Sequence, residues 1–468
     1  MAQSVNDCPL AMENDLVYNS SSSFRLGNTT GHIKGVFRMS TGTKLTAAGP
    51  VEPSRQSIYY GWANLVIAAL AMVGTLPGRT QGLGLVTEPL IAELHIDRVT
   101  YAGINLWATL TGAVFCLPFG RLTDHFGCRI VLTGVLLSLG GTVLVMSHTV
   151  GLLALCITIT LTRGFGQSAL SVVSLALVGK WFARRLNFAM GVYSLLVGLG
   201  FIAAFPGVGH AVLTLGWRTA WFGVGLALLV VLAPLAWLLV RNNPEEWGLR
   251  VDGSSADSDP RLSDLTLGKA LASPAFWVFA LSSSIFGLVY SGISLFNQSI
   301  LEQRGFDATT YHTVLAVSTL LGLLANFGGG WLASRWPIQR LMGTGMAVLA
   351  AAVFGLPLVR TYTHVMLYGV AMGVSGGVVT VVFFSAWGQV FGRTHLGRIQ
   401  GCAQMMTVFA SAIGPLLLAE TLRQTGSYDL MFYSLSLVVT ILGVSSWYVP
   451  LPLRLLEPPS TATRGIIP

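Results

Sequence analysis

Long apolar stretches separated by short polar segments make up most of the chain from residue 60 onward. Each stretch has about 20 residues or more, which is enough to cross a hydrocarbon core of about 30 Å as a helix. The first six lie at roughly 60–86, 100–119, 130–147, 151–179, 189–213 and 218–240. The last six lie at roughly 273–300, 310–333, 341–359, 364–391, 399–420 and 429–450. The pattern predicts an all-α membrane protein with twelve transmembrane helices in two pseudo-symmetric six-helix bundles.

The polar segments divide this pattern into parts. Residues 1–57 are rich in Ser, Asn, Thr and Gly and lack the apolar core of a secretory signal, so we expect a disordered tail that stays in the cytoplasm. A hydrophilic cytoplasmic linker at 241–270 separates an N-terminal bundle, 58–240, from a C-terminal bundle, 271–450. Residues 451–468 are expected to form a short C-terminal tail.

The basic residues predict the topology, because cytoplasmic loops carry an excess of Lys and Arg. With both termini inside, most of the 27 Lys and Arg residues fall on the cytoplasmic side. The outer loops then hold only Arg98, Arg218, Arg304, Arg360 and Arg423. We therefore expect a multi-pass protein of the plasma (inner) membrane with cytoplasmic N and C termini.

The two halves resemble copies of one another at an offset of 210 residues. Gly120-Arg-Leu-Thr-Asp124 aligns with Gly330-Trp-Leu-Ala-Ser334, and Ala189-Met-Gly191 aligns with Ile399-Gln-Gly401. Two separate landmarks that share one offset indicate an internal repeat, and transporters are commonly built from repeats with the binding site between them. Because Ser334 takes the place of Asp124, we expect the charged contact to be stronger in the first half.

Composition argues against several other classes of protein. Of the 468 residues 53% are hydrophobic and 10% are charged, whereas about a quarter are charged in soluble domains. The five cysteines show no CxxC spacing and no pairing with histidine, so we expect neither a disulfide framework nor a metal site. The net charge of +8 comes from basic residues in separate short loops, which does not indicate a nucleic-acid partner.

No motif indicates catalysis. The Ser and His residues occur in no nucleophile motif, and no Gly-rich loop ends in Lys-Ser or Lys-Thr. We therefore expect a protein that is not an enzyme, needs no cofactor and takes its energy from ion or solute gradients.

A charged stretch, Gly120-Arg-Leu-Thr-Asp-His-Phe-Gly-Cys-Arg129, lies between the second and third apolar spans. Its glycines favour a tight connection, in which the Asp124 carboxylate can accept backbone N–H bonds at a helix start and also face Arg129. The spacing of Gly120, Asp124, Gly127 and Arg129 resembles the signature loop between helices two and three of the major facilitator superfamily. The alternative is an ordinary charged loop in another kind of membrane protein.

Further stretches narrow the resemblance to a branch of that superfamily. These stretches are Tyr60-Gly-Trp62, Gly179-Lys-Trp-Phe-Ala-Arg-Arg185, Asn243-Pro-Glu-Glu-Trp-Gly248 and Phe391-Gly-Arg-Thr-His-Leu-Gly-Arg-Ile-Gln-Gly401. Together they are similar to the oxalate/formate antiporters and monocarboxylate porters, over most of residues 58–450. Members typically place a cationic side chain in helix eight, and some another in helix eleven, to hold substrate carboxylates. Here residues 310–333 and 399–420 contain no Lys or Arg.

Two arginines lie inside predicted spans, where a charge near the helix centre costs about 2.5–3.5 kcal/mol. Arg79 follows Pro77 in helix one, and the glycines around it favour an interrupted helix whose backbone groups can meet a ligand. Arg163 lies near the middle of helix four. In the superfamily that the chain resembles, both helices line the central cavity, so the two guanidinium groups are candidates to bind one carboxylate.

Each arginine also has a structural interpretation. Arg163 resembles an arginine that is common in helix four of the superfamily, where it often hydrogen-bonds backbone or neighbouring polar groups. The alternatives for Arg79 are that it snorkels outward or that it pairs with Glu88. The second alternative would make Glu88 a candidate for proton coupling.

The other candidate substrate-binding residues are polar or aromatic. Gln81 and Gln167 lie close in sequence to the two arginines. Tyr290, Asn297 and Gln298 lie in helix seven, which corresponds to helix one at the offset of 210 residues. They would line the site with polar and aromatic groups, and the alternative is that they pack between helices.

We predict a conformational latch on the cytoplasmic side. Asp124 and Arg129, with Arg184 and Arg185 of the loop between helices four and five, would stabilise the state that is closed to the cytoplasm. Gly120 and Gly127 would allow the close approach of the chain segments that carry these charges.

The sequence therefore predicts a secondary active transporter of a small organic anion, a mono- or dicarboxylate, that works by alternating access with anion exchange or proton symport. Its partners would be this substrate and the lipid bilayer, and we expect a monomer. The first alternative is a porter or exporter of neutral or cationic small molecules, such as sugars or drugs, in which both arginines are structural. The second is a membrane sensor that binds a ligand without moving it.

Overall fold

The computed structural model describes residues 59–249, 251–253 and 264–452. The expected disordered tail at 1–57 lies outside the described residues, as do 453–468 of the C-terminal tail and 254–263 of the linker. The described residues fall within one unit, Ile58–Pro468, and contain helices but no β-strand.

The first half contains helices at each of the six predicted spans, and several spans consist of consecutive helical segments. In chain order the segments are α1 (Gly61–Val73), the 3₁₀ turn η1 (Leu76–Gly78), α2 (Thr80–Leu94), α3 (Arg98–Ala113), α4 (Cys116–Phe126), α5 (Cys128–Ser147), α6 (Leu152–Thr162), the π-helical η2 (Arg163–Leu170), α7 (Ser171–Trp181), α8 (Leu186–Leu215), α9 (Trp217–Leu226), the π-helical η3 (Ala227–Leu232) and α10 (Ala233–Leu239).

The second half is more regular and follows a linker with short helical turns. The linker contains η4 (Glu245–Trp247) and η5 (Val251–Gly253). The segments that follow are α11 (Leu267–Leu271), α12 (Pro274–Glu302), α13 (Ala308–Ala333), α14 (Ile338–Gly355), η6 (Leu356–Leu358), α15 (Tyr362–Phe391), α16 (Leu396–Thr425) and α17 (Asp429–Tyr448).

Eleven helices of the described part are long and apolar enough to cross a membrane. The predicted span at 60–86 is not among them because it is divided into α1, with 13 residues, and α2, with 15 residues. Between them lies η1 with Pro77, followed by Arg79 in an extended conformation (φ −87°, ψ 153°). Proline removes a backbone donor, which favours this break. The twelfth predicted crossing is therefore present as an interrupted helix.

The charged stretch at 120–129 is helical over most of its length. α4 continues to Phe126, and only Gly127 (φ 84°, ψ 161°) separates it from α5. A positive φ favours glycine, and a Cβ atom at this position would lie 2.5 Å from Oδ1 of Asn242. Asp124 is therefore fixed in the last turn of a helix, whereas the sequence indicated a turn.

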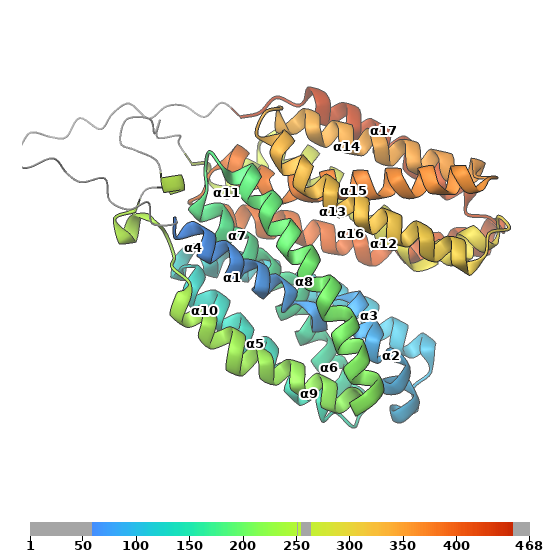
Figure 1. Ribbon diagram of the computed structural model, residues 1–468, viewed down its shortest axis with the longest axis horizontal. Coiled ribbons are helices and arrows are strands. Elements are labelled where there is room, and N and C mark those ends of the chain that lie inside the picture. Colours follow the sequence, from blue (N-terminus) through green and yellow to red (C-terminus); the bar gives the residue numbers. More distant parts are fainter. Residues whose placement is uncertain (1–58, 250, 254–263, 453–468) are drawn as a thin grey trace, which may run out of the picture. The chain divides into compact units, whose positions relative to one another are not determined.

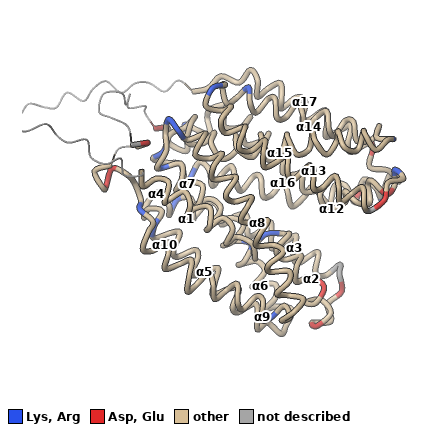
Figure 2. The backbone as a smooth tube through the Cα atoms, in the orientation of Figure 1, with Lys and Arg blue, Asp and Glu red and all other residues tan. Residues whose placement is uncertain are grey.

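The helices form two groups that meet closely at one end (Figure 1). One group contains α1 to α10 and the other α12 to α17, and the groups diverge toward the opposite end of the molecule. We call the end at which α4, α7 and α13 end and α8 and α16 begin the latch end. Figure 2 shows that most Lys and Arg residues of the described part gather at this end, whereas several acidic residues mark the other end.

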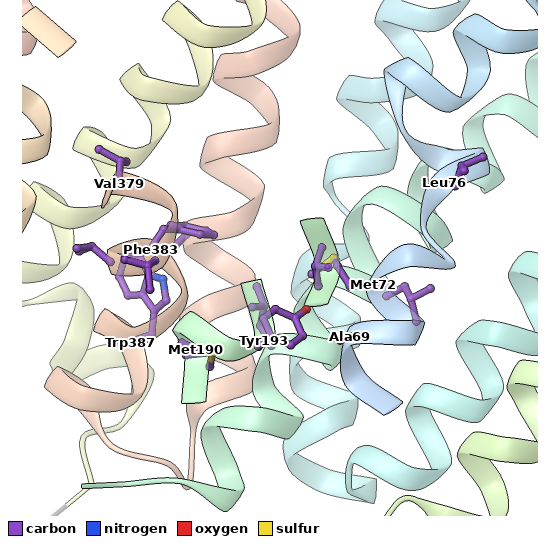
Figure 3. Close-up of a cluster of buried hydrophobic side chains, with 14 of the residues drawn as sticks. Ala69, Met72, Leu76, Met190, Tyr193, Val379, Phe383 and Trp387 are labelled. Carbon is purple, nitrogen blue, oxygen red and sulfur yellow. The ribbon is translucent and has the colours of Figure 1, made fainter. Parts of the chain in front are cut away.

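A buried apolar cluster lies where the two groups meet. Figure 3 shows Tyr193 of α8 between Met72 of α1 and Phe383 of α15. The ring of Tyr193 packs edge-on against Phe384, with 5.6 Å between the ring centroids. Its hydroxyl group is hydrogen-bonded to Oγ of Ser174 at 2.9 Å, so the buried polar atom has a partner. This cluster joins the two halves.

The internal repeat is visible in the contacts between the halves. α4 packs on α16 so closely that a Cβ atom on Gly120 would overlap the carbonyl oxygen of Gly397. α13 packs on α8 in the corresponding way, and a Cβ atom on Gly330 would lie 2.8 Å from the carbonyl oxygen of Asn187. Both pairs are related by the offset of 210 residues. The two halves therefore meet through two equivalent pairs of helices, and small residues allow their backbones to approach.

Candidate substrate site and latch

Arg79 lies at the break in the first membrane-crossing segment, directly before α2. Its Nε donates to Oγ1 of Thr75 at 2.7 Å, and its Nη2 donates to Sδ of Met72 at 3.1 Å. The guanidinium carbon lies 4.9 Å from the ring centroid of Phe201 in α8, a cation–π distance. The side chain is only partly buried, and none of these contacts is with a carboxylate.

Arg163 is the more enclosed of the two arginines, with 3% of its surface exposed. Its Nη1 donates to Oγ1 of Thr80 at 2.9 Å and to Oε1 of Gln167 at 3.0 Å, and its Nη2 donates to Oδ1 of Asn105 at 3.0 Å. Nη1 also lies 3.4 Å from the carbonyl oxygen of Gly78. These acceptors come from the broken helix, from α3 and from η2. Through its bonds to Gly78 and Thr80, Arg163 holds the chain in place on both sides of Arg79.

The other predicted substrate residues have different surroundings. Gln81 is exposed on α2, and Gln167 accepts from Arg163. Tyr290 stacks on Phe286 with 43% of its surface exposed. Asn297 is buried and accepts from the hydroxyl of Tyr368 at 3.3 Å.

Among the described contacts of these predicted substrate residues, Gln167 is the one that contacts an arginine, which is Arg163. Among the contacts of the described residues, none joins Tyr290 or Asn297 to either arginine. Gln298 donates to Oε1 of Glu302 at 2.8 Å, within its own helix. Glu88 lies on the exposed side of α2.

Asp124 is the centre of the latch and contacts the second half of the chain. Its carboxylate accepts from the backbone N–H groups of Gly397 at 3.0 Å and Arg398 at 2.9 Å, in the first turn of α16. A carboxylate at this position satisfies free N–H groups and is favoured by the helix dipole. Nζ of Lys180 lies 3.7 Å away and Nε of Arg398 lies 3.9 Å away, while the Asp124 side chain is only 3% exposed.

Arg129 does not face Asp124, contrary to the sequence-based expectation. Its Nε donates to the carbonyl oxygen of Trp237 at 2.7 Å, and its guanidinium group stacks on the Trp237 ring at 4.5 Å. Its backbone N–H donates to Oδ1 of Asn242 at 2.9 Å. The physical reason is that α4 stays helical to Phe126, so Asp124 points to the second half while Arg129, beyond Gly127, packs on α10.

Arg184 and Arg185 lie at the same end but not at Asp124. Both side chains are exposed, and the backbone N–H of Arg184 donates to Oδ2 of Asp252 at 2.6 Å. The cations beside Asp124 are instead Lys180 and Arg398, which sequence analysis did not single out. Both lie in stretches that carried the family resemblance, and this was the available signal.

A second contact between the halves was also missed. Nδ2 of Asn187 in α8 donates to the carbonyl oxygen of Ala333 in α13 at 2.6 Å. Asn187 corresponds to Gly397 at the offset of 210 residues, so this bond lies where the Asp124 contact lies in the other helix pair.

The model of the Major Facilitator Superfamily matches residues 57–368 and 279–467. The chain belongs to this superfamily. Monocarboxylate transporter 13 from Rattus norvegicus is 23% identical over 380 residues, which cover 80% of this chain and 85% of that protein. Monocarboxylate transporter 11 from Homo sapiens is 26% identical over 424 residues, which cover 88% of this chain and 87% of that protein.

A solved structure supports the fold independently. The crystal structure of the human organic anion transporter MFSD10 (TETRAN) matches with a TM-score of 0.61 at 16% identity, covering 82% of this chain and 99% of that chain. These findings confirm the predicted superfamily and the all-α fold, and the chain is similar to monocarboxylate transporters, as the sequence motifs indicated. The protein is a multi-pass membrane transporter and not an enzyme.

Proposed function

We propose that the protein transports a small organic monocarboxylate by alternating access of its two halves, with Arg79 compensating the charge of the substrate. The observation that carries this proposal is the difference between the two arginines inside the membrane-spanning region. Arg163 is enclosed by oxygen acceptors of the chain. Arg79 is partly exposed at a helix break, and its hydrogen bonds with described residues use only Nε and Nη2.

The energetics favour an anionic ligand at Arg79. A guanidinium group within a membrane-spanning helix costs about 2.5–3.5 kcal/mol, and a carboxylate that binds it offsets part of this cost through charge-assisted hydrogen bonds. One available guanidinium group matches one carboxylate better than two. This is why we propose a monocarboxylate, within the broader class of mono- and dicarboxylates.

The relatives support the same substrate class. Two of them carry the name monocarboxylate transporter and align with 80% or more of this chain. The substrate cation in this chain lies in the first crossing, since spans at 310–333 and 399–420 have no Lys or Arg. Gln81 and Tyr290, both exposed, are proposed as further contacts.

We further propose that the latch end faces the cytoplasm of the plasma (inner) membrane, with both termini inside. The concentration of Lys and Arg at that end supports this orientation (Figure 2). Anion exchange needs no proton carrier in the protein, whereas proton symport would use Glu88 or a substrate that carries its own proton. The protein is expected to work as a monomer.

Uptake of labelled monocarboxylates into proteoliposomes tests the function. Wild-type protein should give uptake and counterflow, Arg79→Ala should abolish both, and Arg79→Lys should retain a fraction because an ammonium group keeps the charge but not the bidentate geometry. Arg360→Ala, in an exposed loop, is the matched control and should transport normally. Undiminished uptake by Arg79→Ala, or transport of neutral or cationic solutes only, would contradict the proposal. Binding without counterflow would indicate a sensor.

A further inference from the structure

The carbonyl groups at the C-terminal end of α7 accept hydrogen bonds from side chains outside this helix. The last carbonyl groups of a helix have no intrahelical partner. At the end of α7 the carbonyl of Trp181 accepts from the hydroxyl of Tyr59 at 2.9 Å. The carbonyl of Lys180 accepts from Nη1 of Arg393 at 2.6 Å. Tyr59 belongs to the first half, as α7 does, but Arg393 belongs to the second.

Arg393 is held in place by Asp264, at the end of the linker that leads into the second half. Its backbone N–H donates to Oδ1 of Asp264 at 3.2 Å, and Asp264 also binds Thr394 through its other oxygen. Gly392 precedes it with a φ of 96°, and a Cβ atom there would overlap Oδ1 of Asp264. The carboxylate can approach this loop because the residue is glycine. The guanidinium group of Arg393 is thereby directed across the boundary between the halves.

The partner carboxylate on the other side is that of Glu245. Nη2 of Arg393 lies 2.8 Å from Oε1 of Glu245, in the turn η4 after α10. This turn is fastened to the first half, because Arg241 stacks on Trp247 at 4.3 Å and its carbonyl accepts from Nε1 of Trp181 at 3.0 Å. Arg393 therefore joins the second half to α7 of the first half and to the linker turn η4, which is fastened to that half.

We propose that Arg393 and Glu245 form a second latch between the halves, reciprocal to the Asp124 latch. Asp124 of the first half caps the first turn of α16, and Arg393 of the second half caps the last turn of α7. Opening the latch end leaves one helix end without its cap in each half. The cap charges match the helix dipoles, negative at an N-terminus and positive at a C-terminus.

Lys180 couples the two latches. Its Nζ lies 3.7 Å from Oδ1 of Asp124 and donates to the carbonyl of Thr123 at 3.3 Å, while its own carbonyl accepts from Arg393. One residue of α7 thus contacts both caps. Separation of the halves breaks the bonds of α16 to Asp124 and the bond of Arg393 to the Lys180 carbonyl, whereas Lys180 and Asp124 stay together in the first half.

A distance measurement tests this proposal without a known substrate, so it stays separate from the test of Arg79. Spin labels are attached through an unnatural amino acid at His125 and at Ser334, one exposed residue of each half at the latch end. The labelled protein is then placed in nanodiscs. The ratio of latch-closed to latch-open protein should fall about tenfold in Arg393→Gln, which loses both contacts. Glu245→Gln should give a smaller fall, because the bond to the Lys180 carbonyl remains.

Arg340→Ala is the matched control. Arg340 is exposed at the beginning of α14 at the same end, and its side chain forms no hydrogen bond or ion pair with the described residues. Its distance distribution should match that of the unmutated protein, and Asp124→Asn should show the shift of a broken latch. Arg393→Lys should recover part of the closed population. A distribution in Arg393→Gln that matches Arg340→Ala, while Asp124→Asn shifts, would overturn the proposal.

Discussion

In each of the two helix pairs that join the halves, a glycine lies against the backbone of the partner helix, but different side chains hold the two pairs together. In the α4–α16 pair Gly120 packs on Gly397, and the Asp124 carboxylate binds two N–H groups of α16. In the α13–α8 pair Gly330 packs on Asn187, and the Asn187 amide donates to one carbonyl of α13. Ser334, at the position equivalent to Asp124, bonds back to the carbonyl of Trp331 in its own helix.

This difference indicates that the repeat brings the helix backbones close together in both pairs. The individual side chains determine how strongly each pair of helices is held. Hydrogen bonds to charged groups contribute about 1.5–3 kcal/mol, whereas neutral ones contribute about 0.5–1.5 kcal/mol. We therefore expect the α4–α16 contact to dominate the closed state of the latch end and the α13–α8 contact to assist it.

The largest effect is expected from Gly120→Ala. The added methyl group overlaps the Gly397 carbonyl, and overpacking at such a contact costs about 1–3 kcal/mol or more. Distances between labels at the latch end should lengthen strongly. Gly330→Ala is the matched variant and should do so less, because its Cβ atom would still lie 2.8 Å from the nearest oxygen. Equal shifts in both variants would contradict a dominant α4–α16 contact.

Asp124→Asn should follow with a loss of about 1.5–3 kcal/mol from the closed state. The side chain keeps its shape, but its amide group presents donors toward the N–H groups of α16 and loses the attraction of Lys180 and Arg398. Transport kinetics should show a lower maximal rate with a smaller change in substrate affinity. A pure affinity loss at normal maximal rate would count against the latch role.

Asn187→Ala should cost the closed state about 0.5–1.5 kcal/mol, since it removes one neutral hydrogen bond to Ala333. The same label distances check this value. Raised salt should leave the effect of Asn187→Ala unchanged, because no charge is lost. A loss as large as that of Asp124→Asn would show that the two locks are equal.

The smallest effect, and one of opposite sign, is expected from Ser334→Asp. By the repeat, a carboxylate at 334 should lie near the first turn of α8, where the helix dipole favours a negative charge by about 0.3–1 kcal/mol. The closed state should gain population, and the variant should partly restore it in an Asp124→Asn background. No gain in either background would mean that the equivalent position cannot reach α8.

Much of the fold could be predicted because hydrophobic length and loop charge are local properties of the chain. Twelve apolar stretches imply twelve crossings, and Pro77 with its neighbouring glycines implies the break at Arg79. The offset of 210 residues also identified Gly120, Gly191, Gly330 and Gly401 before their contacts were known. All four lie at the boundary between the halves.

The partners of the charged residues could not be predicted in the same way. Asp124 was expected to face Arg129, five residues on, but it binds Gly397 and Arg398, more than 270 residues away. The spacing of residues along one loop does not determine the direction in which the side chains at the end of a helix point. Arg79 and Arg163 were both candidates to bind the substrate, and the hydrogen bonds of Arg163 to groups of α3, η1 and α2 could not be predicted from the sequence.

The sequence by itself determined that this chain crosses the membrane many times, that its halves are repeats and that charge is scarce inside the spans, because these follow from the cost of placing polar groups in hydrocarbon. Only the tertiary structure decided which charges meet. Contacts such as Asp124 with α16, and Arg393 with α7 and Glu245, arise where the two bundles meet. Their geometry depends on helix packing over the whole molecule.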